Sequence, residues 1–468
     1  MRVARVLRVL ATVIFTFVFL SAGLRARAQQ QDQGDRRDRR DRRFRVLHNF
    51  QGGLDPLGVE GLAVDSNGTL YGESILGGPL ICFTDLGFCE DAGARFKLDR
   101  HGVYSLLPSP TGSDNPIGGS AGPVLLDNEG NLVFAADVGG ADGHGGVFSQ
   151  NPRTGDVAPL FSFSDFPVDG ATPLTGVIRD AAGNLYGATL GGGHNPSGAC
   201  AIGDLTGGCG TIYKLDAKTH QETVLHTFDF DAGWEGWGLA RDGAGNLFGS
   251  TPRGGDTPCR EGPEPIGCGL VFRIDSSGNF SVIHRFSHRP TCPFISCPPS
   301  PPGAEVHGVG PSYLTVDEEG TVFGVTQLGG NFGLGVIFKI DTAGKYTVLH
   351  HFAGPFDGFN TQALALRDGK LYGVNFEGGN ILDCGFGSGC GTIFVVDTKT
   401  GKFSVLHTFS RIEEGAGPTA LAFDEKGDVF GATFFGAAGV GDPNRCTGGE
   451  GCGNVFKFRL RDRDDDDE

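Results

Sequence analysis

One multi-part motif recurs seven times along this chain of 468 residues. Its first part is a polar turn between two apolar runs, as in "LAVDSNGTLYGES" from Leu62 and "VIRDAAGNLYGAT" from Val177. The other copies begin at Val124, Leu239, Leu314, Leu364 and Leu421, and the second copy is the most degenerate. The copies recur at a mean spacing of about 60 residues, so we expect a fold made of seven similar units.

Each unit predicts four short strands. After the first part come a run such as "GTIYKLDAKT" from Gly210 and a closing run such as "VLHTF" from Val224. Asp and Asn-Gly between apolar runs predict tight hairpins, and two hairpins make a four-stranded antiparallel sheet. The 80 glycines argue against long helices. One small sheet cannot bury both faces alone, whereas a ring of seven stacked sheets can.

The two ends of this repeat region complement each other. The seventh unit has "GNVFKF" from Gly453 but lacks the closing run, and a spare copy, "RVLHNF", lies at residues 45–50. We therefore predict an all-β fold, a seven-bladed β-propeller of four-stranded antiparallel blades over residues 44–460. An N-terminal strand would complete the last blade and remove a free sheet edge.

The flanking segments predict export. Residues 1–28 have a basic start, an apolar stretch and "ARA", as in a signal peptide. An uncleaved membrane anchor is the alternative. We expect residues 29–43 to be a disordered charged linker and 461–468 an acidic disordered tail. The mature protein is then expected to be secreted, periplasmic or at the cell surface, monomeric and without a transmembrane segment. The net charge of −17 argues against nucleic acid partners.

The full pattern resembles a known tandem repeat. The order "DxxGxLYG", a glycine pair, a run like "GVIFKID" and "VLHxF" resembles the GloVer-type repeat of exported bacterial proteins. More distantly it is similar to NHL and gluconolactonase-like propellers. The first resemblance implies a propeller but no activity. The gluconolactonase-like propellers hold a divalent ion, but their ligands cannot be matched to residues of this chain.

The loops predict which face carries function. With the strands of a unit called A to D, the A–B and C–D turns are short, whereas the B–C loops and D–A links are long and share the opposite face. We expect disulfides there, since the cysteines form six near neighbours and lack zinc-knuckle spacing. The expected pairs are Cys82 with Cys89, Cys200 with Cys209, Cys259 with Cys268, Cys292 with Cys297, Cys384 with Cys390, and Cys446 with Cys452.

Acidic residues in the D–A links are candidate metal ligands. Asp55, Asp169, Asp231 and Asp357 occupy similar places in four units, and a ring of carboxylates could hold Ca²⁺. The alternative, which repetition favours, is that each acid caps its own turn. We therefore predict no cofactor, with Ca²⁺ as the open alternative. The repeated histidines of the D strands and the repeated glycine of "LYG" are expected to be structural. The glycine would let neighbouring backbone approach.

Residues that break the repeat are candidate ligand contacts. Trp234 and Trp237 are the only tryptophans and share one D–A link, where planar rings could stack on a sugar. The alternative for Trp237 is packing between blades. His194 and His307 lie on loops of the same face.

These features favour binding over catalysis. The sequence has no nucleophile elbow, HExxH motif or phosphate loop. Our first hypothesis is an exported binding module for a glycan or another cell-envelope component. The alternatives are a metal-dependent hydrolase or lactonase with a site at the propeller axis, and a purely structural surface repeat.

Overall fold

The computed structural model describes residues 43–460 with internal gaps. The gaps are residues 53, 79, 84–87, 92, 109–121, 165–168, 174, 194–207, 256–259, 262–263, 266, 288–306, 380–387, 411–413 and 437–451. The predicted signal peptide, linker and acidic tail fall outside the described residues, apart from the last linker position. Within the described ranges, no helix has the length and apolarity that a bilayer span requires.

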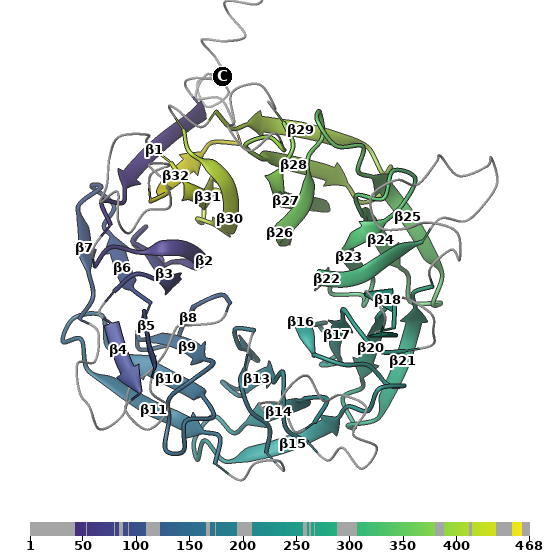
Figure 1. Cartoon of the computed structure of the whole chain (residues 1–468), viewed down its shortest axis with the longest axis horizontal. Helices are drawn as coiled ribbons and strands as arrows, with labels where there is room; N and C mark the ends of the chain where they lie inside the picture. Colours follow the sequence, from purple (N-terminus) through teal and green to yellow (C-terminus); the bar gives the residue numbers. More distant parts are fainter. Residues whose placement is uncertain are drawn as a thin grey trace, which may run out of the picture.

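Seven four-stranded antiparallel sheets surround a common axis (Figure 1). The innermost A strands are β2 (Leu57–Val64), β8 (Leu125–Leu126), β12 (Ile178–Arg179), β16 (Trp237–Arg241), β22 (Gly308–Val316), β26 (Phe359–Arg367) and β30 (Ala416–Phe423). The B strands are β3 (Leu70–Leu76), β9 (Leu132–Ala136), β13 (Leu185–Ala188), β17 (Leu247–Thr251), β23 (Val322–Gly329), β27 (Lys370–Glu377) and β31 (Val429–Phe435).

The outer half of each blade repeats as regularly. The C strands are β6 (Arg95–Leu98), β10 (Gly146–Gln150), β14 (Thr211–Leu215), β20 (Leu270–Ile274), β24 (Val336–Ile340), β28 (Thr392–Asp397) and β32 (Asn454–Phe458). The outermost D strands are β7 (Tyr104–Leu106), β11 (Val157–Ser162), β15 (Glu222–Thr227), β21 (Phe280–Arg285), β25 (Tyr346–His351), β29 (Phe403–Thr408) and β1 (Phe44–Asn49). The predicted seven-bladed propeller is confirmed.

The ring closes through its first strand, as predicted. The last sheet has the order β1-β32-β31-β30, so residues from both ends of the repeat region share one blade. Phe44 pairs with Phe458 and Asn49 with Asn454. The Phe44 ring also lies 4.3 Å from the His407 ring and edge-on to Phe409 at 5.6 Å. Strand β1 therefore joins its own blade by backbone bonds and the sixth blade by side-chain packing.

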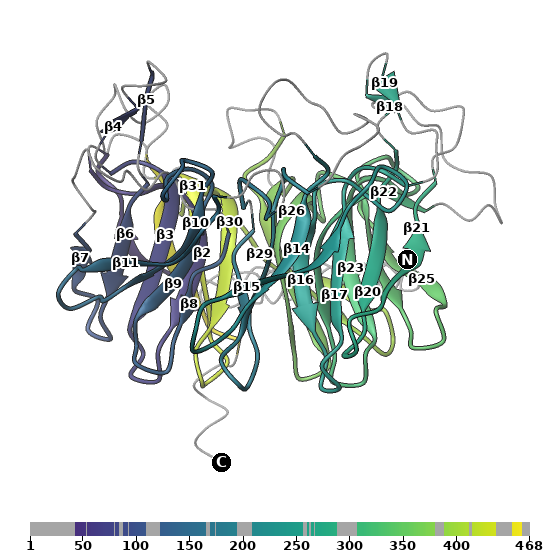
Figure 2. The ribbon, with the colours of Figure 1, turned by 90° about the horizontal axis from the view of Figure 1, so that it is seen from below.

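The B–C loops project from one face of the ring (Figure 2). Two of them carry small hairpins, β4 (Leu80–Phe83) with β5 (Phe88–Asp91) and β18 (Arg260–Glu261) with β19 (Glu264–Pro265). The short A–B and C–D turns lie at the opposite face. We call the side with the B–C loops and D–A links the loop face.

The repeated glycine makes room for a side chain, which corrects our expectation of close backbone approach. In six blades, a Cβ at this glycine would overlap the buried ring that strand C presents from the same blade. The six pairs are Gly72 with Phe96, Gly187 with Tyr213, Gly249 with Phe272, Gly324 with Phe338, Gly373 with Phe394, and Gly431 with Phe456. The degenerate second blade has Phe134 there, and its ring stacks on Phe148 at 5.7 Å.

The repeated histidines join neighbouring blades. Each of five D-strand imidazoles stacks on an aromatic ring of the next blade's D strand, with ring centroids 3.6 to 4.3 Å apart. The pairs are His48 with Tyr104, His226 with Phe280, His284 with Tyr346, His350 with Phe403, and His407 with Phe44. These contacts cross blade boundaries at the outer rim and bury the imidazoles that the sequence suggested were structural.

Stability should fall as the pH drops through the histidine range. Burial lowers the pKa of His226 and of His284 from 6.5 to about 4. The unfolded chain therefore binds protons below about pH 6.5 that the folded chain excludes until about pH 4, and stability is lost across that window. We expect the melting temperature to decrease between pH 7 and pH 5. The variant His226→Phe should show a shallower decrease, and an unchanged slope would contradict this assignment.

Candidate functional site

The innermost strands of five blades share an irregularity in their pairing. In five blades the pairing of strand A with strand B skips one or two residues, which marks a β-bulge. The skipped residues are Glu60, Gly238 with Leu239, Ser312 with Tyr313, Gln362, and Thr419. Asn360 and Glu235 adopt left-handed backbone conformations just before two of these bulges, with φ of 59° and 64°. Such strained positions concentrate at functional sites.

Three residues of the innermost strands belong to blades that face one another across the axis. Glu60 is in the first blade, Trp237 starts β16 in the fourth and Tyr313 is in the fifth. In a ring of seven, one blade faces the junction between two others, and Figure 1 shows β2 across the axis from β16 and β22. The charge of Glu60 acts on Tyr313. We call these three residues the axial site.

The Glu60 carboxyl has a raised pKa. Its side chain retains access to solvent, but neighbouring protein atoms remove part of the water around it. Desolvation raises its pKa to about 7, and the Asp137 charge adds to the increase. A hydrogen bond from the Gly122 backbone amide opposes it. The Glu60 charge in turn helps to raise the pKa of Tyr313, after burial as the larger cause. Glu60 and Tyr313 are therefore electrostatically coupled.

A buried acid lies beside Glu60. Glu73 is 2% exposed, its two carboxylate oxygens accept no hydrogen bond, and burial raises its pKa to about 8. The Arg95 guanidinium is 3.9 Å away, but Arg95 Nε donates to Gln150 Oε1 at 2.8 Å. The same guanidinium lies 3.9 Å above the Phe134 ring. Arg95, which pairs with Glu73 at this distance, is thus also engaged by Gln150 and Phe134.

The two aromatic residues form adjoining walls. The Trp237 and Tyr313 rings meet edge-on, with centroids 6.5 Å apart and an interplanar angle of 85°. Both side chains are half-buried. A perpendicular pair of this kind leaves an aromatic corner, which accepts an apolar ring face or a cation.

The structure separates the residues we predicted to bind ligand. Trp234 is 5% exposed and packs in the core between the third and fourth blades, with Arg253 5.5 Å from its ring. His307 lies near the rim, 5.1 Å from Tyr346 and 5.7 Å from His284. His194 lies outside the described residues. Of the three described residues, Trp237 alone is part of the axial site.

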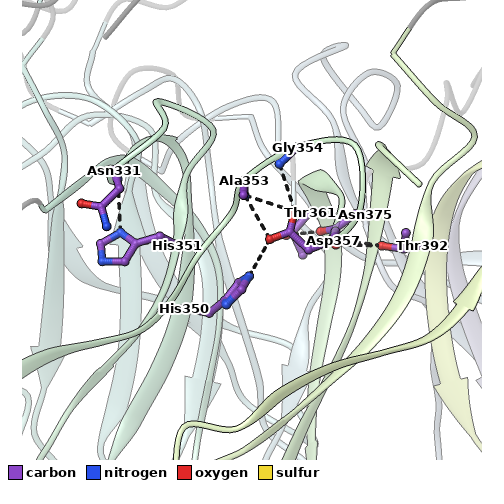
Figure 3. A network of polar contacts seen from close by, with 9 residues as sticks. All are labelled: Asn331, His350, His351, Ala353, Gly354, Asp357, Thr361, Asn375 and Thr392. Carbon is purple, nitrogen blue, oxygen red and sulfur yellow. Dashed lines mark hydrogen bonds and ion pairs between the residues drawn. The ribbon is translucent and has the colours of Figure 1, made fainter. Parts of the chain in front are cut away.

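The predicted metal ligands lie in separate D–A links. The Asp357 carboxylate accepts from His350 Nε2 at 2.8 Å and from the backbone amides of Ala353 and Gly354 (Figure 3). Its backbone oxygen accepts from Asn375 and Thr392. Asp357 thus fixes its own turn and anchors the stacked histidine, as the alternative reading of these acids expects.

The other predicted acids have similar local contacts. Asp55 accepts from Tyr104 Oη and the Gln51 amide, both at 2.8 Å. Asp169 accepts from the Ser164 amide at 2.8 Å, and the backbone oxygen of Asp231 accepts from Arg285. Across the described residues, no group of three or more His, Cys, Asp or Glu could hold a metal ion.

Four described cysteines lie just before C strands. Cys209, Cys268, Cys390 and Cys452 are buried and disulfide-bonded. Their expected partners lie outside the described residues: Cys200, Cys259, Cys384 and Cys446. So does the pair Cys292 and Cys297. The backbone of the β4–β5 hairpin sets Cys82 opposite Cys89. The six pairings stay predictions.

Two sequence signals point to these contacts. The first is the spacing of seven between a D-strand histidine and the acid it binds, as in His350 with Asp357 and His407 with Glu414. The second is the variety of residue types two positions before the start of the repeated motif. Glu60, Trp237 and Gln362 stand there, ahead of Leu62, Leu239 and Leu364.

The fold and the axial residues together define a tandem-repeat propeller with a chemically mixed centre. The family model of the Gloeobacter/Verrucomicrobia repeat matches residues 301–463. The predicted resemblance to this repeat is thereby confirmed. No curated protein matches the chain.

Solved structures share the fold at low sequence identity. A streptogramin B lyase has a TM-score of 0.52 at 13% identity, with 89% of this chain and 98% of that chain covered. The virginiamycin B lyase of Staphylococcus aureus has a TM-score of 0.51 at 12% identity, covering 89% and 100%. A gluconolactonase from Xanthomonas campestris has a TM-score of 0.41 at 12% identity, covering 89% of each chain. These likenesses show the fold alone.

Proposed function

We propose that this propeller is a binding module that holds a glycan at its axial site. The observation that carries the proposal is that the innermost strands bear a carboxyl, Glu60, and two adjoining aromatic rings, Trp237 and Tyr313, and that the Glu60 charge acts on Tyr313. Proteins that bind sugars stack aromatic rings on the sugar's apolar face and bind its hydroxyls with carboxyls and amides. Trp237 and Tyr313 supply the first kind of contact, and Glu60 supplies the second.

The loop face adds exposed aromatic area. Phe356 is 90% exposed in the D–A link before β26, and Phe332 is 51% exposed in the neighbouring B–C loop. The bonds from Ala353 and Gly354 to Asp357 hold the Phe356 turn in place. A large exposed aromatic side chain on a fixed turn is typical of a contact surface. A long ligand at the axis could extend over these rings.

An array of cell-envelope and other oligosaccharides tests this proposal. We expect the full chain to bind at least one glycan and Trp237→Ala to bind it about tenfold more weakly, because one aromatic stacking surface is lost. Trp234→Phe is the matched control, since that ring lies in the core. Equal binding by Trp237→Ala and the unchanged protein would rule out the axial site.

We also propose that the protein acts after export, in the periplasm, outside the cell or at its surface, as a monomer with six disulfides.

A metal-dependent hydrolase or lactonase stays the alternative. Elemental analysis of the purified protein and melting with added Ca²⁺ test that alternative, which a bound metal ion would favour. A purely structural role predicts no glycan ligand.

A further inference from the structure

We propose that the glycan bound at the axial site carries free amino groups, with one ammonium held between Glu60 and the rings of Trp237 and Tyr313. This inference rests on the proposed glycan-binding function and names the class of its ligand. It follows from the local charge, from the aromatic corner and from the poor fit of a metal ion.

The first argument is local charge. The Asp137 charge raises the pKa of Glu60, and the Glu60 charge raises that of Glu73. Arg95 is paired with Glu73 and also contacts Gln150 and the Phe134 ring. Buried carboxyls without a matching cation are costly in the ionised form. Glu73 is almost fully buried without a hydrogen bond. A ligand cation beside Glu60 would relieve this imbalance.

The second argument is the aromatic corner. An ammonium is attracted to the faces of Trp and Tyr rings, and the attraction grows when water is excluded. Two rings at 85° present two such surfaces to one ligand. The strand of Glu60 lies across the axis from the strands of the two rings, and the charge of Glu60 acts on Tyr313. A ligand between these strands would contact the carboxylate on one side and the rings on the other.

An organic cation fits these groups better than a metal ion. Calcium requires six to eight oxygen ligands, and aromatic rings offer none. No cluster of three candidate ligands occurs among the described residues. The aromatic area also suits a sugar ring, and Gln362 adds an amide at the same level. Its nitrogen donates to Asn360 Oδ1 at 2.8 Å, which leaves the carbonyl oxygen for a ligand hydroxyl.

The test compares two sugars that differ in their amines. Calorimetry would measure binding of a chitosan oligosaccharide, which carries free amines, and of a chitin oligosaccharide of equal length, in which the amines are acetylated. We expect the full chain to bind the chitosan oligosaccharide about tenfold more tightly. Glu60→Gln should abolish this preference while still binding both sugars. Trp237→Phe should keep the preference, and Trp237→Ala should weaken the binding of both sugars.

A control is needed because the whole chain is acidic, with a net charge of −17. Glu318→Gln removes one exposed carboxyl from an A–B turn, on the face opposite the loop face. It should leave the preference intact. Equal losses in Glu60→Gln and Glu318→Gln would overturn the inference, since they would show attraction by the overall charge. Melting curves would verify that each variant is folded.

The binding results distinguish failure of the amine inference from failure of the proposed glycan binding. Equal binding of both sugars would overturn the amine inference and leave glycan binding standing. Equally tight binding of a simple amine such as lysine methyl ester would also overturn it, because a sugar would then be unnecessary. If no glycan of any kind binds, the proposed function itself is wrong.

Discussion

A chain that begins after Asn49 should fail to close its ring. Deletion of β1 removes the fourth strand of the last blade and exposes the edge of β32, from Asn454 to Phe458. It also uncovers Phe409 and the His407 ring in the sixth blade. Unpaired edges and exposed apolar surface favour aggregation and local opening. We expect loss of the cooperative melting transition, measured by calorimetry and limited proteolysis.

A circular permutation provides the matched control. Moving residues 44–50 to follow residue 460 through a short Gly-Ser linker restores every residue but changes the connection. Since the ring needs the strand and not its position in the chain, this variant should melt cooperatively again. Retained cooperative melting in the deletion itself would contradict the role we assign to β1.

Substitution of Gly373 by alanine should destabilise the sixth blade. An added Cβ would overlap the Phe394 ring, which is fully buried. Overpacking of a close-packed core costs about 1–3 kcal/mol. We expect a lower melting temperature without a change in blade number, measured by circular dichroism and differential scanning calorimetry.

The partner ring supplies the control for this substitution. Phe394→Leu alone should also destabilise the protein, because it leaves a cavity. In the double variant the alanine enters the space that the ring vacates, so the combined loss should be smaller than the sum of the single losses. Additive losses would mean that Gly373 and Phe394 are not coupled as the structure indicates.

The sequence allowed the fold to be predicted because each unit carries its own turns and strands. The spare "RVLHNF" run even identified β1 as the closing strand, since a ring leaves one strand missing at one end and one extra at the other. The role of the repeated glycine was harder to predict from the sequence. Gly187 admits the Tyr213 side chain, and a contact between strands of one blade is not visible in spacing alone.

The candidate site was harder to predict. Trp237 was recognised because tryptophan is rare here, but Trp234 was grouped with it although its ring lies in the core. Glu60 went unnoticed since its partners are three blades away in either direction around the ring. Glu60 and Tyr313 lie at bulges of strand A, and a single sequence does not show where pairing skips a residue.

An odd number of blades has a consequence for how a ligand can lie at the centre. With an even number, each unit would have an identical counterpart opposite, and a duplicated side chain could face its own copy. Here the first blade faces the seam between the fourth and fifth, so one end of the ligand meets a carboxyl and the other meets two rings. The two sides of the centre therefore differ chemically. A sugar that lies across the centre with an amine at one end would have a preferred orientation, with the amine toward the carboxyl.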